Sequence, residues 1–74
     1  MSKFPRLKAK DLIRTLKKVG FAVVRSKGSH HFVGHPDGRC TVVPVHSGDT
    51  LGTGLLHKIL KDVGLSAEEL LRLL

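Results

Sequence analysis

Two segments with the apolar spacing of an amphipathic helix enclose a stretch of strand-forming residues, and this arrangement most restricts the fold. Between Leu12 and Val19 the apolar side chains recur with the helical period, and Gly20 follows as a common stop signal. The intervening positions are polar and mostly basic, so we expect solvent to cover them. The pattern predicts a first helix over residues 8–19.

The second apolar stripe runs from Leu55 to Val63 and is closed by Gly64. After it, Ser66 and Glu69 have the spacing of a capping box, which predicts a last short helix. This terminal segment is rich in leucine, and we expect it to pack on the domain.

Between the helices, three short runs rich in β-formers are separated by turn signals. The runs are residues 21–26, 29–35 and 40–43, with Lys27-Gly28 and then Pro36–Arg39 between them. Short turns between successive strands predict an antiparallel meander, which Pro44 should end.

The predicted fold class is therefore α+β, with the order α-β-β-β-α and an extra C-terminal helix. Both long helices have one apolar face, so they should cover the same side of a three-stranded antiparallel sheet. This order is that of a double-stranded-RNA-binding domain. A chain of 74 residues allows one domain, residues 1–74, without room for a deep cavity, so a substrate has to bind on an open surface.

The charge is strongly basic and unevenly distributed. The formal net charge is +7, and residues 1–39 hold ten lysines and arginines against two acidic residues. A basic half of this density favours a phosphate-bearing partner, because each neutralised phosphate releases counterions. Solubility alone is the alternative explanation.

The single cysteine, Cys40, excludes an intramolecular disulfide, and we expect it to be a buried thiol in the third strand. The first residues lack the apolar run of a signal peptide, and no stretch has membrane-spanning length. These features predict a cytoplasmic protein with no membrane partner.

Five histidines are present, and two of them, His30 and His31, follow the Lys27-Gly28-Ser29 turn. Consecutive strand residues point to opposite faces, so one of the two should face solvent. An imidazole can donate or accept a proton at cellular pH, and RNA brings its own nucleophile, the 2′-hydroxyl. Arg25, Lys27 and the backbone N–H groups around Gly28 would stabilise a charged phosphorane. These arguments do not separate His30 from His31, and polar strand residues without a role remain the alternative.

The other histidines and Cys40 suggest a metal site at first sight. However, no Cys-x-x-Cys or His-x₃-His pair holds two ligands together, and adjacent histidines on a strand diverge. We therefore expect no metal and no cofactor. His57 lies off the apolar stripe of its helix and is expected to be a plain surface residue.

Four motifs occur in order along the chain, and together they resemble the HicA family of mRNA interferase toxins. They are Gly28-Ser29-His30-His31, His35-Pro36-Asp37-Gly38, Val42-Val43-Pro44-Val45-His46-Ser47-Gly48 and Leu56-His57-Lys58-Ile59-Leu60. The resemblance implies the toxin of a type II toxin–antitoxin system, an mRNA-cleaving enzyme that inhibits translation and growth. It implies a single catalytic histidine, which maps onto His30, and a HicB-type antitoxin that blocks the active site.

Around His30 we assign secondary roles to its neighbours. His31 is expected to orient or pack, and His46 and Ser47 to form a loop contact to phosphate. Two departures from the family pattern occur. Gly54-Leu55-Leu56 stands at the start of the second long helix, where Gly-Thr-Leu is usual, and Thr53 is expected to take over the cap. Phe32-Val33-Gly34 replaces the usual aliphatic-aromatic-polar triplet after His31, and Gly34 is expected to mark a bulge.

The leading hypothesis is a metal-independent endoribonuclease acting on mRNA through His30. The alternative is a non-catalytic RNA-binding module on the same fold. A protein-interaction domain that docks through its apolar C-terminal segment is a third reading.

Overall fold

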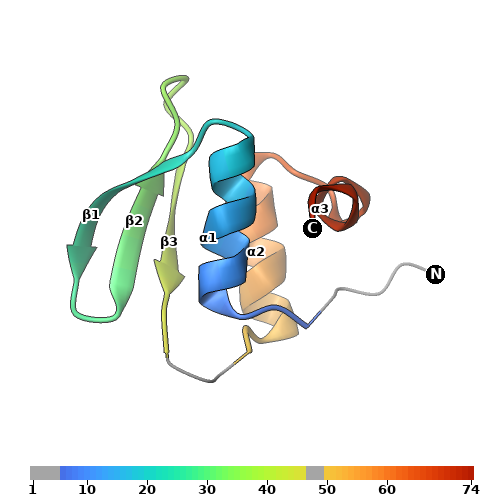
Figure 1. Ribbon diagram of the computed structural model, residues 1–74, viewed down its shortest axis with the longest axis horizontal. Helices are drawn as coiled ribbons and strands as arrows, with labels where there is room; N and C mark the ends of the chain where they lie inside the picture. Colours follow the sequence, from blue (N-terminus) through green and yellow to red (C-terminus); the bar gives the residue numbers. More distant parts are fainter. Residues whose placement is uncertain (1–5, 47–49) are drawn as a thin grey trace.

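The computed structural model describes residues 6–46 and 50–74, in the order helix, three strands and two helices (Figure 1). The elements are α1 (Ala9–Lys18), β1 (Ala22–Lys27), β2 (His30–Gly34), β3 (Cys40–Pro44), α2 (Thr53–Val63) and α3 (Ala67–Leu73). The predicted α+β order is confirmed, and each strand agrees with its predicted range within one residue at either end.

The three strands form an antiparallel meander with β2 in the centre. The pairing of β1 with β2 is interrupted between Val23 and Arg25, where Val24 forms a bulge. The prediction of a bulge at Gly34 is wrong, because Gly34 pairs regularly with Ala22 and Cys40. The irregularity lies instead in the neighbouring strand, and it shifts the side-chain alternation of β1 by one residue.

Both long helices cover one face of the sheet, and the other face is open (Figure 1). The sheet buries Val33 and Val43 against the helices, with Val23 packed beside them. The space between the sheet and the helices is filled by side chains that are at most 1% exposed, which are those of Leu12, Leu16, Leu56 and Ile59. The core is therefore one layer of aliphatic side chains between the sheet and the helix pair.

Cys40 is exposed, which contradicts the expectation of a buried thiol. The residues of β3 that face the helices are Thr41 and Val43, so Cys40 and Val42 point to the open face. Pro44 is the last residue of β3 and does not lie beyond it. A proline is tolerated there because β3 is an edge strand.

The helices end at the predicted glycines. Gly20 follows α1 with φ 98°, and Gly64 caps α2 with φ 73° in the left-handed region. The N-cap of α2 is Gly52, without a side-chain hydrogen bond, so the prediction that Thr53 caps this helix is wrong.

The capping box of α3 is confirmed. The backbone N–H of Glu69 donates to Ser66 Oγ at 3.0 Å, and the Ser66 N–H donates to Glu69 Oε1 at 3.0 Å. Leu70 is completely buried, so α3 packs on the domain as expected. The C-terminal end of α3 also contacts α1, because Lys18 Nζ donates to the carbonyl oxygen of Leu73 at 2.8 Å.

Within the described part of the chain, none of the helices has the length and apolar character needed to cross a bilayer.

Candidate active site

The turn between β1 and β2 brings most of the predicted site residues together at one end of the sheet. Gly28 lies in this turn with φ 58°, a conformation that favours glycine. A Cβ atom built on Gly28 would meet nothing within 4 Å, so the surroundings of the turn are open. Lys27 and His30 lie directly opposite each other on either side of it.

His30 is exposed and lies on the open face of the sheet. Its strand neighbours are Lys27 on β1 and Pro44 on β3. Directly opposite residues of an antiparallel pair share a face, so Lys27 presents its charge on the same side as the His30 imidazole.

The bulge at Val24 is what places these basic residues beside His30. Val23 lies opposite the buried Val33, so it faces the helices. A regular strand would turn Arg25 to the same side, but the extra residue puts it opposite Phe32 on the open face. The guanidinium carbon of Arg25 lies 4.9 Å from the centre of the Phe32 ring.

His31 points to the opposite face, toward α1, and is half-buried. Its Nδ1 lies 3.3 Å from the carbonyl oxygen of Ser29. That same oxygen accepts the backbone N–H of Val45 at 2.7 Å, which fixes the turn to the segment after β3. The two adjacent histidines are therefore on different faces, in agreement with the expected strand alternation.

His46 follows β3 and is exposed at the same end of the sheet, where β2 begins beside Pro44. Its expected neighbour in phosphate binding, Ser47, lies outside the described residues. Exposed His57 lies on α2 and lines a hollow with the residues that lead into α3, on the helix side of the molecule.

The centre of the open face is more apolar than the overall charge suggests. A hollow of about 550 Å³ includes Val24, Phe32, Cys40 and Val42 of this face in its wall, and it extends past β3 to Lys58 and Asp62 of α2. Val24 is 70% exposed, because it follows the helix-facing Val23 and lies on the open face of an edge strand. Of the basic residues on this face, Lys27 lies beside His30, and Arg25 lines the hollow.

Three basic residues of α1 line a groove beside His31, although the apolar stripe of this helix predicted only solvated positions for them. Lys10, Arg14 and Lys17 have the spacing i, i+4 and i+7, which places them along one side of the helix. This spacing was visible in the sequence, but the strand residues that complete the groove were not.

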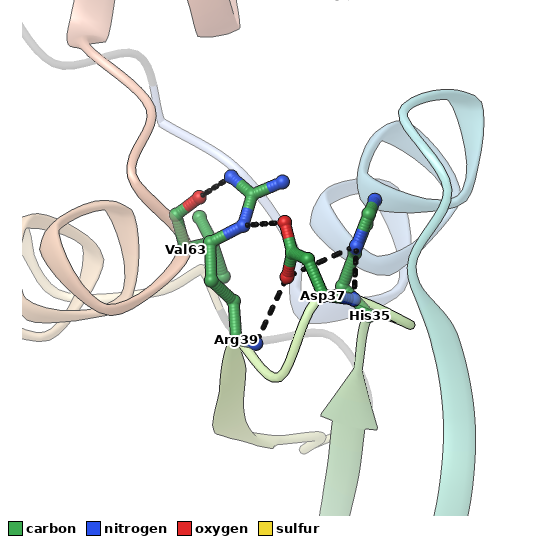
Figure 2. Close-up of polar contacts among 4 residues, drawn as sticks. All are labelled: His35, Asp37, Arg39 and Val63. Carbon is green, nitrogen blue, oxygen red and sulfur yellow. Dashed lines mark hydrogen bonds and ion pairs between the residues drawn. The ribbon is translucent and has the colours of Figure 1, made fainter.

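A polar cluster at the far end of the sheet holds the β2–β3 turn (Figure 2). Asp37 accepts the backbone N–H of Arg39 at 3.0 Å and its Nε at 2.7 Å, and the Nη1 of Arg39 donates to the carbonyl oxygen of Val63. The N–H of Arg39 is the main reason why the pKa of Asp37 lies below its usual range, and the Arg39 guanidinium adds to this effect.

His35 completes this cluster, and its Nδ1 has two contacts with Asp37. It lies 3.1 Å from the backbone N–H and 3.0 Å from Oδ1. The first contact requires an unprotonated Nδ1 and the second a protonated one, so only one of them is a hydrogen bond at a time. The imidazole packs edge-on against Phe21, with ring centres 4.9 Å apart. The motif His35-Pro36-Asp37-Gly38 therefore has a structural role.

In residues 6–46 and 50–74, no group of three or more His, Cys, Asp or Glu side chains is placed to hold a metal ion. The side chains of His30 and His31 point to opposite faces of the sheet, so this pair cannot bind the same metal ion.

Comparison with known families gives a match to the model described as the HicA toxin of bacterial toxin–antitoxin systems, over residues 9–65. No curated protein matches the sequence. The match extends from the first residue of α1 to just beyond the end of α2 and thus includes the whole sheet. The chain therefore belongs to the HicA toxin family, the toxins of pairs in which an antitoxin is the partner.

Proposed function

We propose that this toxin is a metal-independent endoribonuclease that cleaves mRNA and thereby inhibits translation and growth. The observation that carries the proposal is the exposed imidazole of His30, which shares the open face with Lys27 beside a turn with free space around it. The open space at Gly28 is consistent with the approach of a single strand of RNA at this turn.

The chemistry needs few protein groups because the substrate supplies the nucleophile. The 2′-oxygen forms a bond to phosphorus, the bond from phosphorus to the 5′-oxygen breaks, and the products end in a 2′,3′-cyclic phosphate and a 5′-hydroxyl. One proton leaves the 2′-hydroxyl and another is added to the 5′-oxygen. His30 transfers one of these protons, and water at the exposed site accounts for the other.

Lys27 stabilises the negative charge that develops on the phosphorane, since it lies opposite His30 on the same face. Arg25 is held over Phe32 and extends the positive charge along the same strand. The backbone N–H groups around Gly28, with Ser29 and exposed His46, supply further polar contacts to phosphate at this end of the sheet.

The test is the cleavage of a labelled mRNA by purified protein in the presence of EDTA. His30→Ala should slow cleavage by about 10²- to 10⁴-fold, the usual contribution of a general acid or base. His57→Ala is the matched control, because it removes another exposed histidine from the helix side of the molecule. Cleavage by His30→Ala at the wild-type rate would overturn the assignment.

The other outcomes separate the remaining readings. Loss of cleavage in EDTA would mean that a metal takes part. An RNA band that shifts on a gel without degradation would identify a non-catalytic RNA-binding module, and a protein that neither shifts nor degrades RNA would identify a protein-interaction domain.

The effect on cells follows from the same variant. Expression of the wild-type chain without its antitoxin should stop growth, while His30→Ala should not. Because His30 is exposed and not part of the core, His30→Ala should still be captured by the HicB-type antitoxin in a pull-down.

A further inference from the structure

A groove on the helix side of the molecule lies directly behind the proposed active site. It has a volume of about 390 Å³ and lies between α1 and the sheet. Lys10, Arg14 and Lys17 of α1 line it, with His31 from β2. Ile13, Val23 and Val45 supply the apolar part of its wall.

The charges of this groove are available to a ligand. Arg14 contacts Asp11 at 2.9 Å, but the two side chains are 70% and 37% exposed, and such exposed pairs are weak. Within the described ranges, no acidic side chain forms an ion pair with Lys10 or Lys17. The helical rise of about 1.5 Å per residue separates Lys10 from Lys17 by about 10 Å along the axis.

His31 adds a polar group to this row of charges. The Ser29 carbonyl oxygen can only accept a hydrogen bond, so the Nδ1 of His31 carries the proton in that contact. This tautomer leaves Nε2 for another partner, as an acceptor when the ring is neutral and as a donor when it is protonated. The half-buried ring is held in the groove wall by its strand and by this contact.

The groove and the site of His30 lie on opposite faces of the sheet, and both are next to the β1–β2 hairpin. His30 and His31 are consecutive residues on opposite faces, and the exposed Lys27 and Gly28 lie beside them at the hairpin tip. A chain that passes His30 on the open face can fold around this tip into the groove.

We propose that this groove, formed by Lys10, Arg14, Lys17 and His31, binds the RNA backbone next to the cleavage point. This inference rests on the proposed function, because it takes RNA as the ligand. At about 3.4 Å per nucleotide of a stacked strand, the row from Lys10 to Lys17 corresponds to about three nucleotides. Lys10, Arg14 and Lys17 bind phosphates, and His31 is a positioning residue that holds the strand where it leaves the hairpin tip.

The experiment measures the binding of a short fluorescent single-stranded RNA by anisotropy as a function of salt. All proteins carry His30→Ala, so that the RNA stays intact. The double variant Lys10→Gln/Lys17→Gln removes two groove charges, and the matched control Lys58→Gln/Lys61→Gln removes two charges from α2. Circular dichroism checks that both double variants remain folded.

The groove variant should bind RNA about 25-fold more weakly at about 0.1 M salt, because each lost phosphate contact lowers the salt slope by about 0.7. The control should lose less than about 3-fold and keep its slope. Equal losses in the two double variants, or unchanged binding in the groove variant, would overturn the proposal.

A second measurement, in the wild-type background, separates the two histidines. His31→Ala should raise KM several-fold with kcat nearly unchanged, whereas His30→Ala should lower kcat with RNA binding retained. Loss of kcat in His31→Ala with normal binding would exchange the roles and contradict the positioning role. If the wild-type protein binds RNA through the groove but never cleaves it, the proposed function fails while the groove assignment stands.

Discussion

Asp37 is the residue through which the β2–β3 turn is fixed to both long helices. It binds Arg39, which donates to the last carbonyl oxygen of α2 at Val63, and it contacts His35 (Figure 2). His35 in turn packs on Phe21 just after α1. A single carboxylate thus links three segments that are distant in the sequence.

Replacement of Asp37 by asparagine should therefore lower the melting temperature at neutral pH. The pKa of Asp37 is depressed in the folded protein, first by the Arg39 backbone N–H. A depressed carboxyl pKa contributes stability above the pKa of the unfolded chain, and this contribution is lost as the pH falls through the folded pKa. The difference in melting temperature between wild type and Asp37→Asn should shrink below about pH 4.

Thermal unfolding followed by circular dichroism at several pH values measures this difference. Asp11→Asn is the control, because the Asp11 carboxylate forms an exposed ion pair with Arg14, and its loss should change the melting temperature little. A difference for Asp37→Asn that stays constant from neutral to acid pH would contradict the argument.

The orientation of single strand residues was harder to predict than the strands themselves. Alternation correctly placed His30 and His31 on different faces, but it did not tell which faced solvent. Arg25 and Lys27 reach the open face only because of the bulge at Val24. Cys40 was assigned to the wrong face, because β-propensity does not reveal which phase of a strand meets the helices.

At the scale of elements, the helices were predictable because their signals are local. The apolar period of α1 and α2 and the glycines that end them can be read without knowledge of the partner elements. The groove was not predictable in this way. Lys10, Arg14 and Lys17 look like ordinary solvated residues until the position of His31 beside α1 is known.

The junction between α1 and β1 requires a glycine at position 20, and Gly54 of α2 provides a control for its replacement. Gly20 has φ 98°, and a Cβ atom there would lie 2.8 Å from His35 Nε2. Gly20→Ala should destabilise the fold by at least about 1–2 kcal/mol, from the backbone conformation alone. Gly54→Ala should instead stabilise it by about 0.5–1 kcal/mol, since a helical alanine is favoured over glycine.

Urea unfolding at equilibrium gives both free energies. The space around Gly54 is open, with nothing within 4 Å of a Cβ atom, so only helix propensity changes there. A Gly20→Ala variant as stable as the wild type would show that the α1–β1 junction relaxes at no cost.

At the scale of the whole molecule, α3 closes the core although the family match ends before it, at residue 65. Leu70 is the buried residue of this helix, while Leu71 is 46% exposed. A domain of this size has a free energy of unfolding of about 4–11 kcal/mol, so one core leucine accounts for a large part of it. The terminal helix thus contributes to the same core that supports the sheet.

Leu70→Ala should lower the free energy of unfolding by about 2–5 kcal/mol, whereas Leu71→Ala should change it by less than about 0.5 kcal/mol. Urea unfolding of the two variants tests this contrast, and equal effects would mean that α3 does not contribute to the core.

Because a partner that binds only the folded toxin raises its apparent stability by mass action, excess antitoxin should restore much of the melting temperature of Leu70→Ala. The proposed RNA cleavage by Leu70→Ala should decrease only in proportion to the fraction of protein that is unfolded, and the rate per folded molecule should not change. The reason is that Leu70 lies in the core, whereas the His30 imidazole lies on the opposite face of the sheet.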